Sequence, residues 1–163
     1  MKLLLIRHGT AEDSAAGGDA QRSLTHEGKK EMKEVASGLR AVVDSIDVIG
    51  ASPLVRAQQT AEIVAKGFGD APIKTVNALV PGSDPSELLG WISEHASKKV
   101  VALVGHEPLL GVLVTWLMTG MENSRVEMTK AGAALLEFDS RIAAGSARLR
   151  CLLTRHELRR LAD

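Results

Sequence analysis

The sequence predicts an α/β fold with a mostly parallel central sheet, and two observations carry that prediction. Strand-like and helix-like segments alternate from the first residues onward, which is typical of strands that are connected through crossover helices. The apolar segments 2–6 and 99–105 carry continuous rather than alternating aliphatic residues, as strands buried on both faces do. The chain has 163 residues, 45% of them hydrophobic and 25% charged, so we expect one globular domain spanning 1–163.

The first half of the chain predicts two strand–helix units. A strand at 2–6 leads into a polar, glycine-containing loop, after which Thr25 caps a helix. The apolar positions of that helix keep helical spacing and are Met32, Val35, Ala36, Leu39, Val42 and Val43. A second strand at 47–52 precedes a helix from about Pro53 to Lys66, with the Ser52 hydroxyl as its expected cap and Pro53 as its first residue.

The second half predicts a similar alternation that ends in a hairpin. A weak strand at 73–77 precedes a helix that starts at Asp84-Pro85 and runs through Ile92. The strand at 99–105 ends at His106, and Pro108 opens a strongly apolar helix. Two strands within 132–140 and 146–154 are joined by a turn, and a short arginine-rich helix at 156–162 follows.

Composition excludes several classes of function. Lys plus Arg and Asp plus Glu both total 20, so no net charge favours nucleic acid or an anionic membrane, and 2% aromatic residues leave few platforms for base stacking. Cys151 is the only cysteine, which rules out an intramolecular disulfide and a cysteine-rich zinc site. We find no signal peptide and no apolar run of membrane-spanning length, and we expect a cytoplasmic protein.

Chemically useful residues follow three of the predicted strands. They are Arg7-His8-Gly9, then Ser52 to Arg56, then Gly105-His106-Glu107-Pro108. Carboxyl ends of parallel strands meet at one edge of a sheet, where ligands bind in open α/β folds. Two arginines and two histidines at one edge indicate a phosphate site, because guanidinium groups hold phosphate oxygens in pairs and keep their charge.

A neutral histidine in such a site is also a nucleophile. His8 is the better candidate, because Arg7 precedes it and Gly9 lets a backbone or ligand approach closely. His106, if protonated, would stabilise charge on the transferring oxygens. Taken singly, His106 fits a hydrogen-bonded structural residue, and Arg56 fits a solvated helix charge.

These residues resemble the histidine phosphatase superfamily, and most closely its small phosphohistidine phosphatases of the SixA type. The resemblance rests on "RHG" at 7–9, "SPLVRAQQT" at 52–60 and "GHEP" at 105–108, in order and with the expected spacing, and covers the chain to about Leu153. It implies a phosphoglycerate-mutase-like three-layer α/β/α sandwich. It also implies His8 as the phosphorylated nucleophile in a phosphate pocket formed by Arg7, Arg56 and His106.

The resemblance further implies that Arg22 joins the pocket, with Asp19 beside it. These two side chains could equally pair with each other in a polar loop. Larger members of the superfamily place a glutamate general acid in the segment that corresponds here to 76–84, which contains no Glu. Glu107 and Asp19 are the remaining candidates for a proton donor. Because imidazole is a better leaving group than an alkoxide, the missing Glu favours phosphohistidine over phosphate esters.

We therefore expect a phosphohistidine phosphatase that acts on a phosphorylated protein, as a monomer and without a cofactor or metal. Two alternatives stay open: a phosphatase of small phosphate monoesters, and a non-catalytic module that binds phosphoproteins. No HExxH, P-loop or GxGxxG motif occurs. His26, His95 and His156 read as surface residues at helix ends, and the arginines from Arg148 to Arg160 as solvated faces that could contact an acidic partner.

Overall fold

In a computed structural model that describes residues 1–162, the chain folds around a six-stranded sheet with the order β3-β2-β4-β1-β5-β6. Four adjacent strands are parallel: β1 (Lys2–Arg7), β2 (Val48–Ala51), β3 (Ile73–Thr75) and β4 (Val100–Gly105). β5 (Ala133–Glu137) pairs antiparallel with β1, and β6 (Arg148–Leu153) pairs antiparallel with β5. The expected mostly parallel sheet is confirmed.

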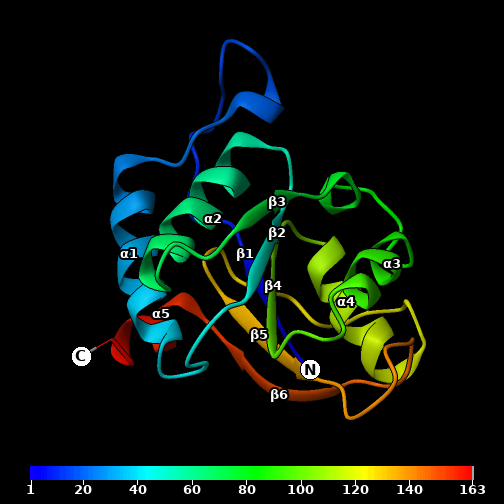
Figure 1. Ribbon diagram of the computed structural model, residues 1–163. Coiled ribbons are helices and arrows are strands. Elements are labelled where there is room, and N and C mark those ends of the chain that lie inside the picture. The colour runs from blue at the N-terminus through cyan, green and yellow to red at the C-terminus, as the bar shows by residue number, and fades with distance from the viewer. Residues whose placement is uncertain (163) are drawn as a thin grey trace.

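Helices cover both faces of this sheet, which gives three layers (Figure 1). On one side lie α1 (His26–Leu39), α2 (Val55–Gly67) and α5 (Arg155–Arg160). On the other side lie α3 (Glu87–Glu94) and α4 (Leu109–Thr119). Two 3-10 turns, η1 (Asp19–Gln21) and η2 (Asn77–Leu79), complete the regular structure of the described residues.

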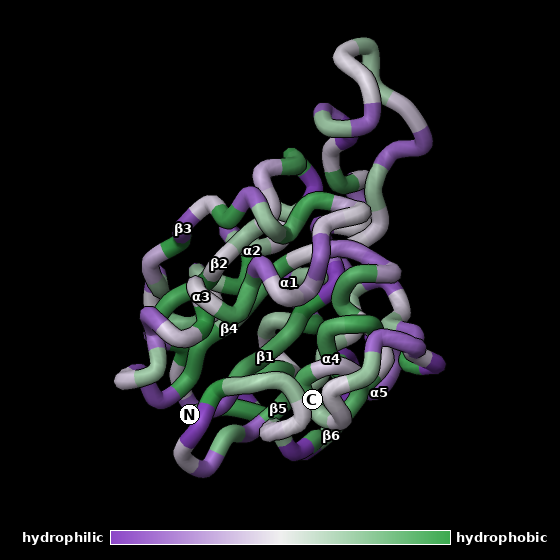
Figure 2. Tube along the Cα trace, turned by 90° about the vertical axis from the view of Figure 1, so that its right-hand side faces the viewer, coloured by the Kyte–Doolittle hydropathy of each residue, from purple (hydrophilic) through white to green (hydrophobic). Residues whose placement is uncertain are grey.

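The continuous aliphatic run of β1 is explained by the two layers of helices. Leu4 and Ile6 point into a core shared with α1 and α2, whereas Leu3 and Leu5 point into a second core shared with α3 and α4. All four side chains are fully buried, and Figure 2 shows the central strands as a hydrophobic layer between the helices. Burial on both faces holds β1 rigidly in the middle of the fold.

Three predicted boundaries are wrong. Pro53 and Ser52 do not begin α2: the N-cap is Leu54, and the Ser52 hydroxyl contacts His106 instead. α1 ends at Leu39, so Val42 and Val43 lie beyond it, although Val43 still reaches the core.

The third boundary is that of α3, which begins at Glu87 rather than at Asp84-Pro85. Asp84 accepts a hydrogen bond from the Ser86 amide in the preceding turn. The other end differs by less, since the helix continues past Ile92 to Glu94.

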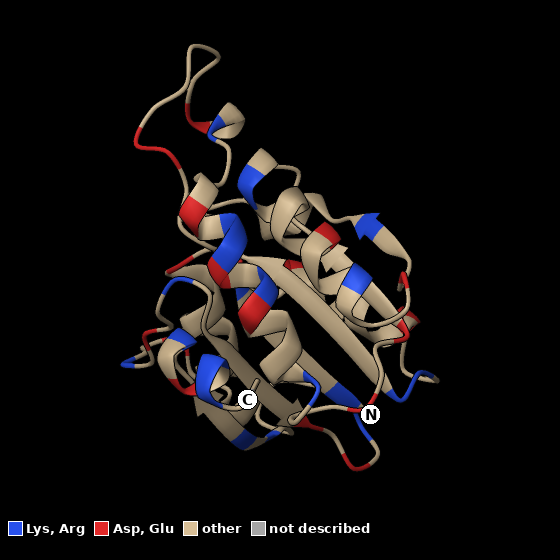
Figure 3. Ribbon diagram, turned by 90° about the vertical axis from the view of Figure 1, so that its left-hand side faces the viewer, with Lys and Arg blue, Asp and Glu red and all other residues tan. Residues whose placement is uncertain are grey.

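Residues 12–23 form an arm that rises beyond the rest of the molecule, above α2 in Figure 1. A bridge between Ala11 and Leu24 closes its base, and the Glu12 amide donates to the Ser23 carbonyl at 2.8 Å. Its charged residues stand out in Figure 3, whereas the strands β2 and β4 carry none. No helix formed by residues 1–162 is long and apolar enough to cross a membrane.

Gly38 lets α1 pack directly on α5. A Cβ atom at this position would lie 1.8 Å from the backbone carbonyl oxygen of Leu158, which cannot move without shifting α5. We expect Gly38→Ala to lower the free energy of unfolding by about 3 kcal/mol, measured by urea denaturation, because the inserted methyl forces the two helices apart.

Gly90→Ala is the matched control, because Gly90 also lies within a helix but has open space at its Cβ position. It should raise the free energy of unfolding by about 0.5–1 kcal/mol through helix propensity. Equal effects of the two substitutions would contradict the packing explanation.

Candidate active site

The three sequence segments singled out above meet at one edge of the sheet. Arg7 pairs with Gly105 in the β1–β4 register, and Ala51 pairs with Val104 in the β2–β4 register. The His8 amide donates to the Gly105 carbonyl at 3.1 Å, directly beyond the last paired residues. The parallel strands therefore bring His8, His106 and the start of α2 into contact.

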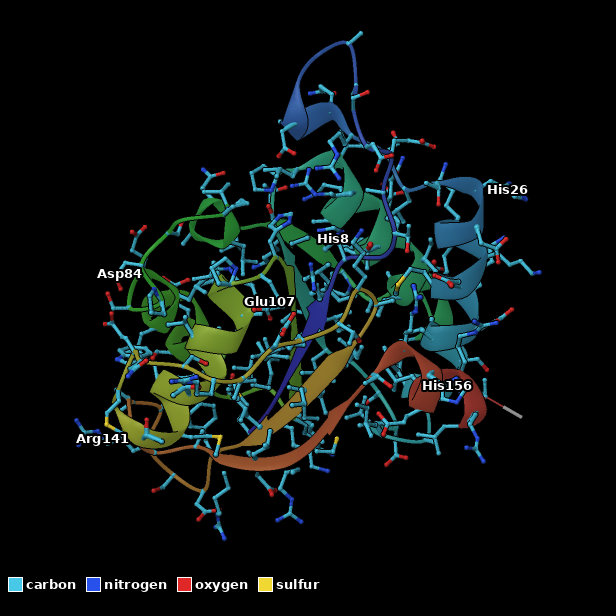
Figure 4. The ribbon with its side chains drawn as sticks, turned by 180° about the vertical axis from the view of Figure 1, so that it is seen from behind. His8, His26, Asp84, Glu107, Arg141 and His156 are labelled. Carbon is cyan, nitrogen blue, oxygen red and sulfur yellow. The ribbon has the colours of Figure 1, made fainter. Side chains whose placement is uncertain are left out.

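The His8 ring has a defined orientation and a defined proton. Its Nδ1 lies 2.7 Å from the Gly9 carbonyl oxygen, which can only accept, so Nδ1 donates. Nε2 therefore carries the lone pair, and the Arg56 Nε donates to it at 3.3 Å. Only 7% of His8 is exposed, and Figure 4 shows the side chain in the interior, whereas His26 and His156 lie on outer helices.

His106 packs beside His8, with ring centroids 4.9 Å apart. Its Nε2 lies 2.8 Å from the hydroxyl oxygen of Ser52, and both residues are buried. Its Nδ1 is buried and has no hydrogen-bond partner within residues 1–162. A buried polar atom without a partner is costly, so this nitrogen fits a ligand.

Both imidazoles are held neutral. Burial, together with the nearby Arg56, Arg7 and Lys130 charges, lowers the pKa of His8 from 6.5 to about 4 against the opposing hydrogen bond to Gly9. Burial also lowers the pKa of His106 to about 3, with His8 and Arg56 as further causes. At neutral pH, His8 therefore presents a lone pair, and the positive charge of the site resides on its arginines.

The arginines supply donors that the protein leaves partly unpaired. Arg7 donates from NH1 to the Met128 carbonyl at 2.6 Å, while its buried Nε has no partner in the described chain. Arg56 is 4% exposed and comes from the first turn of α2, where the helix dipole also favours an anion. Guanidinium groups with donors to spare, here one buried and one half-buried, can hold a tetrahedral oxyanion.

Asp19 and Arg22 reach this site from the arm. Arg56 donates from NH2 to the Asp19 Oδ2 at 3.0 Å and from NH1 to the Asp19 carbonyl at 2.8 Å. Arg22 donates from NH1 to the Asp19 Oδ1 at 2.7 Å. Asp19 thus pairs with Arg22 and at the same time contacts Arg56 of the site. Hydrogen bonds from Arg22 and then Arg56 lower the pKa of Asp19.

Glu107 begins the turn before α4 and faces the backbone. Its Oε1 accepts from the Met128 amide at 3.1 Å, so it holds the segment whose carbonyl binds Arg7. Burial raises the pKa of Glu107, and backbone hydrogen bonds from Met128 and Gly111 oppose that rise. Its visible role is to anchor the 121–131 segment against α4.

Gly9 is required by packing. A Cβ atom there would lie 2.7 Å from the Met32 Cγ of α1. Its amide donates to the Thr60 hydroxyl at 3.2 Å, which ties the end of β1 to α2. Thr60 in turn donates to the Arg56 carbonyl at 2.7 Å.

Sequence reasoning missed Ser52, Thr60 and the 121–131 segment as parts of the site. Lys130 adds positive charge near His8, and the Ala131 amide donates to the His8 carbonyl at 3.1 Å. The order S-x-x-x-R-x-x-x-T at 52–60 was the available signal for the first two. The 121–131 segment carries no periodic pattern that could have placed it.

The surface assignment of His95 is wrong. This residue is 8% exposed, donates from Nδ1 to the Trp91 carbonyl at 2.8 Å and stacks on the Trp91 ring. His26 and His156 are exposed, as expected. Within residues 1–162, no group of three or more His, Cys, Asp or Glu side chains is arranged to hold a metal ion.

Comparison with known proteins places the chain among phosphatases. The family model of the histidine phosphatase superfamily (branch 1) matches residues 3–80. The phosphohistidine phosphatase SixA of Escherichia coli strain K12 is 30% identical over 123 residues, which cover 74% of this chain and 76% of that protein.

Solved structures agree. A protein histidine phosphatase SixA in complex with tungstate superimposes with a TM-score of 0.86 at 25% identity, covering 97% of this chain and 99% of the other. An alpha-ribazole phosphatase from Shigella flexneri has the same fold, with a TM-score of 0.77 at 20% identity over 95% and 97% of the two chains. The fold is therefore the expected phosphoglycerate-mutase-like sandwich. The chain belongs to the histidine phosphatase superfamily and is a phosphatase.

Proposed function

We propose that this phosphatase removes the phosphoryl group from phosphohistidine on a protein, through a phosphorylated His8. One observation carries the proposal: the neutral His8 ring turns its Nε2 lone pair toward the Arg56 guanidinium, beside Arg7 and His106. The similarity to SixA, named a phosphohistidine phosphatase, supports the same substrate class.

In the first step, Arg7 and Arg56 hold the phosphoryl oxygens while His106 donates one further hydrogen bond. As the Arg56 Nε turns from the His8 Nε2 to a phosphoryl oxygen, the Nε2 lone pair forms a bond to phosphorus, and the phosphorus–nitrogen bond of the substrate breaks. The electron pair goes to the substrate ring, which leaves as neutral imidazole when its second nitrogen is protonated. The Nδ1 proton of His8 stays on its hydrogen bond to Gly9. The phosphorylated ring is therefore a cation, and its positive charge offsets the negative charge of the phosphoryl oxygens.

In the second step, water replaces His8 at phosphorus. A new phosphorus–oxygen bond forms, and the bond to Nε2 breaks with its electron pair returning to that nitrogen. The phosphoryl group leaves as inorganic phosphate that contains the water oxygen. Of the two water protons, one stays on phosphate and the other is released to solvent at neutral pH. His8 thereby regains its neutral form with the proton on Nδ1.

Neither acidic candidate is well placed to donate a proton to a leaving group. Asp19 is held ionised between Arg22 and Arg56. The Glu107 carboxylate accepts hydrogen bonds from backbone amides of the 121–131 segment and α4. An alkoxide needs a proton as it leaves, whereas a protonated phosphohistidine already carries one. This difference favours phosphate on nitrogen.

Asp19 is instead a counter-charge that phosphate must displace. Its Oδ2 occupies the NH2 donor of Arg56 that a phosphoryl oxygen would take in bidentate binding. It is bound from an exposed arm, with 60% of its side chain accessible. We assign to Arg22 the role of holding Asp19, and through it the arm, beside the site.

The leaving-group argument predicts substrate preference. The protein should hydrolyse a phosphohistidine protein at least about a hundredfold faster, in kcat/KM, than an alkyl phosphate monoester, because the alkoxide has no proton donor. Release of inorganic phosphate from both substrates, at matched concentrations and corrected for spontaneous hydrolysis, measures the ratio. Efficient turnover of the alkyl ester would instead support the small-molecule alternative.

The control for this comparison is His8→Ala. It should lower kcat/KM by about a thousandfold or more on either substrate, because it removes the nucleophile. Quenching wild-type protein during turnover of labelled phosphohistidine should leave acid-labile, base-stable label on residue 8. Normal turnover by His8→Ala, or label elsewhere, would refute the mechanism.

Removing the Asp19 charge should strengthen phosphate binding. We expect Asp19→Asn to lower the inhibition constant of inorganic phosphate by about three- to tenfold, since a surface-accessible ion pair no longer competes for Arg56. Asp13→Asn changes the net charge equally within the same exposed arm and should have little effect. Equal shifts in the two variants would show a general charge effect rather than competition at Arg56.

The lowered pKa of His8 predicts how protonation depends on pH. In the folded protein the His8 ring should titrate with a midpoint of about 4, followed by NMR of its Cε1 proton, whereas the unfolded chain should titrate near 6.5. Between these values the unfolded state binds more protons, so the free energy of unfolding should fall as the pH drops from 6.5 toward 4. A folded-state midpoint near 6.5 would contradict burial as the cause of neutrality.

A further inference from the structure

We propose that Ser52 is a positioning residue that sets the tautomer of His106, so that the neutral ring presents an N–H to the phosphoryl group. The inference builds on the proposed role of His106 in holding that group. Ser52 itself lies outside the cluster that would touch phosphate. Its hydroxyl acts through the imidazole next to it.

The Ser52 hydroxyl is held in place by its own backbone. The Ser52 amide donates to the Val104 carbonyl of β4 at 3.0 Å, and the Gln58 side chain donates to the Ser52 carbonyl at 2.7 Å. The residue is fully buried. These contacts set Oγ 2.8 Å from the His106 Nε2, across the gap between the ends of β2 and β4.

The direction of this hydrogen bond follows from the partners of the hydroxyl. The Leu54 amide donates to Oγ at 3.4 Å, which uses one of its lone pairs. For the hydroxyl proton, His106 Nε2 is the acceptor that residues 1–162 provide. A buried hydroxyl proton without an acceptor is costly, so Ser52 donates and Nε2 accepts.

The consequence concerns the other ring nitrogen. Burial lowers the pKa of His106 to about 3, so the ring carries a single proton at neutral pH. With Nε2 accepting from Ser52, that proton lies on Nδ1, the buried atom that has no partner in the described chain. Nδ1 can then donate to a phosphoryl oxygen. The opposite tautomer would turn a lone pair toward that oxygen and repel it.

Ser52 thereby fixes the tautomer of His106, as the Gly9 carbonyl fixes the tautomer of His8. A carbonyl accepts from the His8 Nδ1 and frees Nε2 to attack, whereas a hydroxyl donates to the His106 Nε2 and leaves the proton on Nδ1. Both rings carry their proton on Nδ1, yet one offers a lone pair and the other a donor. The two neutral imidazoles can divide their roles without a change of charge.

Nitrogen-15 NMR of the imidazoles tests this assignment in the wild-type protein at neutral pH. We expect a protonated Nδ1 and an unprotonated Nε2 for His106, with the resonances assigned by their loss in His106→Ala. In Ser52→Ala, His106 should shift toward the Nε2-protonated tautomer, while His8 keeps its proton on Nδ1 as an internal control. A wild-type His106 protonated on Nε2, or a tautomer that ignores Ser52→Ala, overturns the proposal.

A double-mutant cycle provides a functional readout that a purely structural role would not produce. Ser52→Ala should lower kcat/KM for phosphohistidine by about tenfold in the wild-type background, roughly the worth of one hydrogen bond. In a His106→Ala background, the same substitution should change kcat/KM by less than about twofold. Equal losses in both backgrounds would show that Ser52 acts by supporting the strand and not through His106.

These outcomes are separable from failure of the proposed function. The tautomer is measured without substrate, so it does not depend on which phosphoryl group the protein cleaves. If His8 is not the site of labelling but His106 follows Ser52, the proposed chemistry fails and the Ser52 assignment stands. If His8 is labelled and His106 is protonated on Nε2, the reverse holds.

Discussion

The site depends on one physical constraint: His8 and His106 are buried beside two guanidinium groups, and burial together with those charges keeps both imidazoles neutral. Protonating His8 or His106 would add charge next to Arg7 and Arg56 where water cannot screen it. Neutrality makes the lone pair of His8 available at ordinary pH. It also makes hydrogen-bond direction, rather than charge, the property that distinguishes the two rings.

The scaffold meets this constraint by fixing backbone atoms around each ring. The His8 amide donates a hydrogen bond to the Gly105 carbonyl, and the His8 carbonyl accepts one from the Ala131 amide. The residue is therefore held between β4 and the segment just before β5. α1 presses close to the same turn, since a Cβ atom at Gly28 would lie 2.1 Å from the Thr10 carbonyl oxygen. A side chain held in this way loses little conformational entropy when it takes up its reactive orientation.

The fold and the principal site residues could be predicted because their signals are local. Continuous aliphatic runs mark the strands, and the residues after them must meet when the strands are parallel, which places His8, Arg56 and His106. Ser52 could not be placed, because a hydroxyl before a helix can cap that helix or bond across the sheet, and only the distance to His106 decides. The 121–131 segment depends on tertiary contacts with α4, for which no sequence period exists. His95 lies four residues after Trp91 at the end of α3, so the helical period was the available signal for its burial.

The fate of the two carboxylates bears on the substrate. A phosphatase acting on alkyl esters needs an acid that is protonated, mobile and close to the leaving oxygen. Here Asp19 is kept ionised by two arginines, and Glu107 is immobilised by the backbone it supports. If Asp19 were released, the arm would lose its contact with Arg56. If Glu107 were released, the Met128 carbonyl that binds Arg7 would no longer be held in place. Both acids are thus engaged in holding the structure around the arginines, and under the proposed function the site suits a phosphoryl group carried on an imidazole whose second nitrogen is already protonated.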